Sequence, residues 1–130
     1  MTRALVCGGR DFRDRKQLDA MLNELHRERG FSLVITGGAG GADQFALLWA
    51  LRRGVETAIF HADWKLGRKA GQIRNARMLK DGKPDVVIAF RSSRGTADTV
   101  ARARAAGVEV IEVHKGAVAR WCSRSAPDII

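Results

Sequence analysis

Five short apolar segments recur at roughly regular intervals along the chain, and this spacing restricts the fold more than any other feature of the sequence. The segments cover residues 4–7, 33–36, 58–60, 86–90 and 108–113. Two of them, 33–36 and 86–90, are continuously apolar or β-branched, which is typical of strands buried on both faces. Helix-like patterns lie between the segments. Alternating strands and helices predict a parallel sheet.

Four helices are indicated between the predicted strands. In the first, the apolar residues fall at i, i+3, i+4 and i+7 and so share one helix face; they are Leu18, Met21, Leu22 and Leu25. The other three cover residues 42–53, 72–80 and 96–106. Crossovers between parallel strands are right-handed, so helices should cover both faces of the sheet. The sequence therefore predicts a single α/β domain over residues 1–130, a Rossmann-like doubly wound parallel sheet of about five strands in three layers (α/β/α).

The end of the chain is less informative. Residues 115–130 are expected to form a tail, with a short helix around residues 117–122.

Positive charge is concentrated in the middle of the chain. The formal net charge is +9, and residues 64–104 hold 11 lysines and arginines against three acidic residues, a local net charge of +8. Either this surface is simply solvated, or it faces an anionic partner such as a nucleotide phosphate or a nucleic-acid backbone.

The remaining composition favours a cytoplasmic protein. No apolar run approaches the length of a membrane span, and the first ten residues lack the pattern of a signal peptide. Cys7 and Cys122 do not have metal-ligand spacing, and the three histidines do not cluster. We therefore expect reduced thiols, no membrane association, no metal site and no cofactor.

Polar and glycine-rich loops follow the predicted strands. They read GGRDF (8–12), GGAGGAD (37–43), HADW (61–64) and RSSRGTAD (91–98). Ligands of open α/β sheets bind at the carboxyl ends of strands, where helix N-termini attract anions. The loops GGAGGAD and SSRGT could therefore hold one phosphate from two sides, although glycine pairs also occur as mere tight turns. Neither a P-loop nor the dinucleotide fingerprint is present, which argues against an ATPase or an ordinary dehydrogenase.

Four motifs occur in a familiar order: GGRDF, TGGAGGAD, ADWKLGRKAGQIRNARM and RGTAD. With them, residues 6–113 resemble the SLOG superfamily of Rossmann-like proteins, and most of all its small YspA-type (YpsA-related) branch. The superfamily includes the LOG phosphoribohydrolases, which cut the N-glycosidic bond of cytokinin nucleoside monophosphates. It also includes DprA-like DNA-binding proteins and domains thought to sense or process nucleotide derivatives. The resemblance implies a nucleotide-type ligand and a homo-oligomer, a dimer or larger.

The LOG active site matches this chain only in part. Its arginine falls on Arg74 in IRNARM, and its phosphate loop matches at Gly95 and Thr96. The loop's glycine pair is replaced by Ser92 and Ser93. Its catalytic glutamate falls on Thr99, which can neither activate water nor stabilise an oxocarbenium ion.

Three side chains are candidates for catalysis: Arg74, and Asp43 or Asp98 as the carboxylate that could replace the missing glutamate. The candidate ligand-binding residues come from the four loops and the helix after the third; they are Gly8, Gly9, Arg10, Asp11, Gly37, Gly38, Gly40, Gly41, Trp64, Lys69, Asn75, Ser92, Ser93, Arg94, Gly95 and Thr96. Purely structural roles would also explain several of these residues: Trp64 could cover the sheet edge, and Asp43 could only stabilise the dipole of its helix.

Three functions are consistent with these residues. The first is a binder or sensor of a phosphorylated nucleoside derivative, a small molecule such as a nucleoside monophosphate, NAD or an ADP-ribose-like compound. The alternative is an N-glycoside hydrolase acting on such a nucleotide. The second alternative is a nucleic-acid-binding module, supported by the central positive charge and the distant likeness to DprA.

Overall fold

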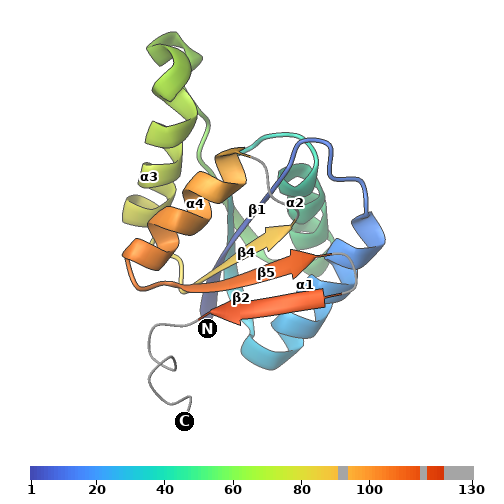
Figure 1. Cartoon of the computed structure of the whole chain (residues 1–130). Helices are drawn as coiled ribbons and strands as arrows, with labels where there is room; N and C mark the ends of the chain where they lie inside the picture. Colours follow the sequence, from blue (N-terminus) through green and yellow to red (C-terminus); the bar gives the residue numbers. More distant parts are fainter. Residues whose placement is uncertain (91–93, 115–116, 122–130) are drawn as a thin grey trace.

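The computed structural model describes residues 1–90, 94–114 and 117–121, the last five by their backbone alone. A six-stranded sheet forms its centre, with strand order β3-β2-β1-β4-β5-β6 (Figure 1). The strands are β1 (Thr2–Gly8), β2 (Phe31–Thr36), β3 (Glu56–Ile59), β4 (Val86–Phe90), β5 (Glu109–His114) and β6 (Ala117–Trp121). The helices are α1 (Arg15–Arg29), α2 (Ala42–Arg53), α3 (Ala70–Gly82) and α4 (Arg94–Ala105), with a 3₁₀ segment, η1 (Trp64–Lys69), before α3.

Strands β1 to β5 are parallel, which confirms the predicted five-stranded parallel sheet. The helix predicted around residues 117–122 is wrong for 117–121, because this segment forms β6, antiparallel to β5. A segment this short cannot hold a helix by propensity alone. As a strand it covers the edge that β5 would otherwise expose.

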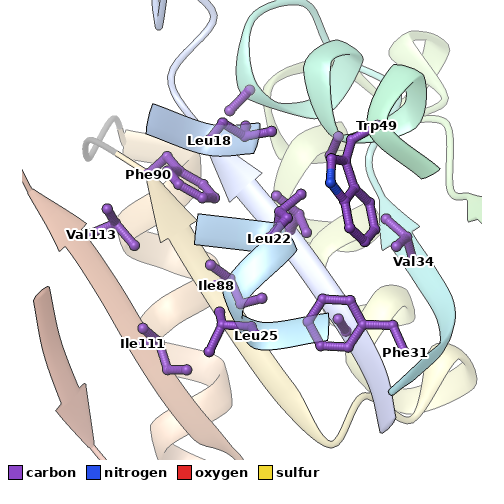
Figure 2. Packing of buried hydrophobic residues seen from close by; sticks show 14 of the residues in the cluster. Leu18, Leu22, Leu25, Phe31, Val34, Trp49, Ile88, Phe90, Ile111 and Val113 are labelled. Atoms are coloured by element: carbon purple, nitrogen blue, oxygen red, sulfur yellow. The ribbon is translucent and has the colours of Figure 1, made fainter. Parts of the chain in front are cut away.

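The sheet is covered on both faces. In β1, Ala4 and Val6 pack toward the core on the side of α1 and α2, whereas Leu5 and Cys7 pack toward the core on the side of α3 and α4. Figure 2 shows the first of these cores, where leucines of α1 contact side chains of β4 and β5. Burial on both faces explains why the segment at 86–90 carries no polar alternation. In the described part of the chain, no helix is long and apolar enough to cross a membrane.

The strand order reverses between β1 and β4. The chain runs outward from β1 to β3, returns to β4 beside β1, and then continues outward in the other direction. Such a reversal leaves a crevice beyond the carboxyl ends of the two central strands. Gly8 ends β1 there, and a Cβ on it would lie 2.5 Å from the Cβ of Ala42, so the start of α2 can pack against this end only because Gly8 has no side chain.

Candidate functional site

A cleft of about 520 Å³ lies at this reversal point. Its walls come from the end of β1 and the loop after it, the loop before α2 with the start of that helix, η1 with the first three turns of α3, and the start of α4. The lining residues are Cys7, Gly8, Arg10, Asp11, Ala39, Asp43, Trp64, Arg68, Gly71, Gln72, Arg74, Asn75, Met78, Arg94, Gly95, Thr96, Asp98 and Thr99. The volume is in the range of pockets that hold small ligands.

The glycine loop before α2 is folded around the carboxylate of Asp43. Oδ2 of Asp43 accepts hydrogen bonds from the backbone N–H groups of Gly37 and Ala39, both at 3.2 Å. The N–H of Gly38 donates to Oγ1 of Thr36 at 3.3 Å. These donors are therefore occupied by the protein itself. The N–H groups of Gly37, Gly38 and Ala39 are therefore not offered to a phosphate as the prediction for GGAGGAD required, and the four glycines of the loop, Gly37, Gly38, Gly40 and Gly41, lie outside the lining of the cleft.

Asp43 is a buried carboxylate facing the cleft, with 6% of its surface exposed. Burial raises its pKa from 3.8 to about 6, and this effect outweighs the two backbone N–H donors and the positive charges of Arg74 and Arg10, which act in the opposite direction. A carboxyl group with this pKa can both hold and release a proton near neutral pH.

Arg74 joins the glycine loop to α3. Its Nη1 donates to the carbonyl of Gly37 at 2.7 Å, and its Nε donates to Oδ1 of Asn75 at 2.8 Å. Its Nη2 makes no hydrogen bond with the residues that the structure describes. Burial lowers the pKa of Arg74, but a guanidinium keeps its charge at any physiological pH.

Asn75 and Asp98 connect α3 to α4. Nδ2 of Asn75 donates to Oδ2 of Asp98 at 3.1 Å and to the carbonyl of Gly95 at 3.3 Å. Arg102 donates to the same Asp98 oxygen at 2.8 Å. Asp98 is thus held in a structural network, whereas Asp43 faces the cleft with Arg74 beside it. Thr99 also lines the cleft, but its hydroxyl donates to the carbonyl of Gly95, one turn back in α4.

The two helix N-termini at the cleft differ in charge. The first turn of α2 contains Asp43, whereas the described first turn of α4 contains no acidic residue. The positive end of α4 therefore lacks a carboxylate of its own, and its residues Arg94, Gly95 and Thr96 line the cleft. The positive end of a helix dipole attracts anions.

The mouth of the cleft carries an aromatic platform. Trp64, at the start of η1, has 59% of its surface exposed, and the guanidinium of Arg10 lies 5.7 Å from the centre of its ring. This arrangement combines a flat apolar surface with positive charge, which suits a nucleobase.

Cys7 forms part of the floor of the cleft. Burial raises the pKa of its thiol well above the usual range, so the thiol stays protonated. The group behaves as a small buried apolar side chain. Among the described residues, no three histidine, cysteine or carboxylate side chains are placed to hold a metal ion.

The structure brings most predicted site residues together at the cleft. Those that line it are Gly8, Arg10, Asp11, Asp43, Trp64, Arg74, Asn75, Arg94, Gly95, Thr96 and Asp98. Those that do not are Gly9, the four glycines of the loop before α2, and Lys69, which lines a separate groove between α3 and α4. Ser92 and Ser93 lie outside the described residues.

Several lining residues were not predicted to contact ligand, among them Arg68, Gly71, Gln72 and Met78. Two of them could have been inferred from helical spacing. Gly71 lies one turn before Arg74 and Asn75, and Met78 lies one turn after them, on the same face of the helix.

Comparison with known proteins gives three results. Residues 2–67 match the model of the YspA, cpYpsA-related SLOG family. The chain is 40% identical over 120 residues to the gene 61 protein of Mycobacterium phage D29, covering 85% of this chain and 95% of that protein. It is similar to a crystal structure of glycinamide ribonucleotide transformylase 1 from Symbiobacterium toebii, with a TM-score of 0.46 and 20% identity over 86% of this chain, and it spans half the length of that structure.

Proposed function

Since the chain belongs to the YspA, cpYpsA-related SLOG family, we propose that it binds a phosphorylated nucleoside derivative in the cleft and acts as a binder or sensor. The ligand class includes nucleoside monophosphates, NAD and ADP-ribose-like compounds. The observation that carries the proposal is the start of α4, which faces the cleft without a carboxylate of its own.

In this proposal the phosphate lies at the first turn of α4. Backbone N–H groups of Arg94 and Gly95 are the donors, and the helix dipole favours the negative charge. Nη2 of Arg74, which has no partner among the described residues, supplies a charged donor from α3. The base stacks on Trp64 beside Arg10, since these residues form the exposed platform at the mouth.

A pair of substitutions at Gly95 tests the phosphate site. Gly95→Asp places a carboxylate in the first turn of α4, which stabilises the helix end and competes with a ligand phosphate. Gly95→Ala is the matched control, because it also replaces the glycine but adds no charge. We expect Gly95→Asp to lower the affinity for nucleoside monophosphates at least tenfold more than Gly95→Ala does, measured by calorimetric titration. Equal affinities in the two variants would place the phosphate elsewhere.

A second candidate function is hydrolysis of the N-glycosidic bond, and the raised pKa of Asp43 favours it. In that reaction the C1′–N bond breaks, a C1′–O bond to water forms, and the proton of the water ends on the departing base. Asp43 would accept this proton near neutral pH, while Arg74 would hold the phosphorylated product. Thr99, at the position of the LOG glutamate, cannot perform this step.

Product analysis separates the two functions. The protein is incubated with nucleoside monophosphates, NAD and ADP-ribose, and the products are separated by liquid chromatography with mass detection. Free base released by the wild type but not by Asp43→Asn or Arg74→Ala would establish hydrolysis. Intact nucleotides in every sample would leave binding as the function of the cleft for these compounds.

A further inference from the structure

A second concave surface lies outside the cleft, between the exposed sides of α3 and α4. This α3–α4 groove has a volume of about 340 Å³, and its charged lining residues are all basic: Lys69, Arg77, Lys80 and Arg102. The two helices lie side by side in Figure 1, with α4 between α3 and the strand β5 in that view. Gln72 lines both the groove and the cleft, so the two surfaces are contiguous.

The basic residues form a line along α3. Lys69, Ile73, Arg77 and Lys80 are spaced at i, i+4, i+8 and i+11, which places them on one face of the helix. At 1.5 Å of rise per residue, this row is about 16 Å long. Asn75 and Met78, on the other side of the helix, are buried.

The groove keeps a surplus of positive charge after its internal ion pairs are formed. Arg102 pairs with Asp98 at 2.8 Å, and Arg77 lies 3.9 Å from Asp81. Lys69 and Lys80 make no hydrogen bond or ion pair with any residue that the structure describes, so neither lysine has a visible role in the fold. Two unpaired charges in a row of this length match an extended anion better than a single phosphate.

We propose that the α3–α4 groove binds the sugar–phosphate backbone of a single-stranded nucleic acid. Lys69 and Lys80 contact phosphates at the two ends of the row, and Arg77 and Arg102 contact phosphates between and beside them. Ile73, 42% exposed in the middle of the row, offers an apolar contact for a sugar or base. This function goes beyond nucleotide binding in the cleft and depends on different residues.

The test measures the salt dependence of binding to fluorescently labelled oligodeoxythymidine and oligouridine by fluorescence anisotropy. Four phosphate contacts on a single strand predict that log K falls with log salt with a slope of roughly −3, so that affinity drops about 50-fold between about 50 and 200 mM KCl. The double variant Lys69→Gln/Lys80→Gln should have half this slope, so that its affinity drops only about 7-fold over the same salt range. Both lysines are exposed, so this variant should fold normally, which circular dichroism checks.

The matched control is Lys16→Gln/Arg27→Gln, which removes the same charge from exposed positions on α1, across the sheet. It should keep the wild-type slope. An equal loss in both double variants would mean that the charge acts only diffusely, and would overturn the proposal. So would a failure of wild type to bind either oligonucleotide at low salt, or equal competition by polyglutamate.

One further variant separates this proposal from that for the cleft. Arg74→Ala removes the cleft's guanidinium but leaves the groove cations in place, so oligonucleotide affinity should persist. If Arg74→Ala abolishes oligonucleotide binding while Lys69→Gln/Lys80→Gln does not, the strand binds in the cleft and the groove proposal is wrong.

Discussion

Replacement of Asp43 by asparagine should stabilise the folded protein at neutral pH. The carboxylate is buried, and burial raises its pKa from 3.8 to about 6. The folded state binds this proton more tightly than the unfolded chain does. Loss of the proton therefore lowers the free energy of unfolding. Asparagine is neutral at every pH, and its Oδ1 can still accept the hydrogen bonds from Gly37 and Ala39.

The magnitude follows from the pKa shift. A shift of about 2 units, at about 1.4 kcal/mol per unit, means that ionised Asp43 costs about 3 kcal/mol. The unfolded chain loses this proton near pH 4, whereas the folded chain keeps it until about pH 6. As the pH rises from about 4 to about 6, ionisation of Asp43 therefore lowers the free energy of unfolding of the wild type. This decrease is complete above about pH 7.

The assay is urea unfolding of the wild type and of Asp43→Asn at several pH values. All other groups titrate alike in the two proteins, so their contributions cancel in the difference. We expect that difference to be near zero at about pH 3 and to rise to about 3 kcal/mol in favour of Asp43→Asn at about pH 7.5. A difference that does not change with pH, or a less stable variant at about pH 7.5, would refute the reasoning. Lost binding or catalysis in the more stable variant would show that Asp43 is retained for function.

Three other substitutions test the fold and the cleft. Gly41→Ala should lower the free energy of unfolding by about 1–3 kcal/mol, because Gly41 has φ +71° and an added Cβ would lie 2.6 Å from the carbonyl oxygen of Arg10. Its control, Gly40→Ala, meets no atom within 4 Å and should change that value by less than about 0.5 kcal/mol in the same urea titration. Leu22→Ala, at a fully buried position, should cost about 2–5 kcal/mol, and a smaller loss would mean that the α1 core is loosely packed. Trp64→Ala should weaken nucleotide binding by about 1–3 kcal/mol in calorimetry without lowering the melting temperature, and unchanged affinity would remove the stacking role.

The sheet and its helices could be predicted from the sequence because their signals are local. The bounds of α2 agree with the predicted 42–53, since Gly54 adopts the left-handed conformation that ends the helix and donates to the carbonyls of Ala50 and Leu51. The strand at 86–90 was also found, because burial on both faces leaves it continuously apolar. Strand β6 was missed, because its pairing with β5 is a tertiary contact that no local pattern encodes.

The site could be predicted only to the level of the sheet edge. Topology brings the loops after β1 and β4 together at the strand reversal, so the location of residues such as Arg10 and Thr96 at this edge could be predicted. The direction of each donor was not predictable. The N–H groups of Gly37 and Ala39 turn inward because the carboxylate of Asp43 lies within reach, which depends on how α2 packs against β1. Similarly, Gly67, at φ +80°, interrupts η1 just before Arg68 and Lys69. Arg68 then lines the cleft, whereas Lys69 lines the α3–α4 groove.

The most direct test of the central claim compares a nucleoside monophosphate with its own nucleoside in calorimetric titrations of the wild-type protein. If the start of α4 and Arg74 bind the phosphate, the monophosphate should bind at least about tenfold more tightly, a difference of about 1.4 kcal/mol. Equal affinity for the two compounds, or binding of neither across adenosine, guanosine, cytidine and uridine, would contradict the assignment of the cleft as a site for phosphorylated nucleosides.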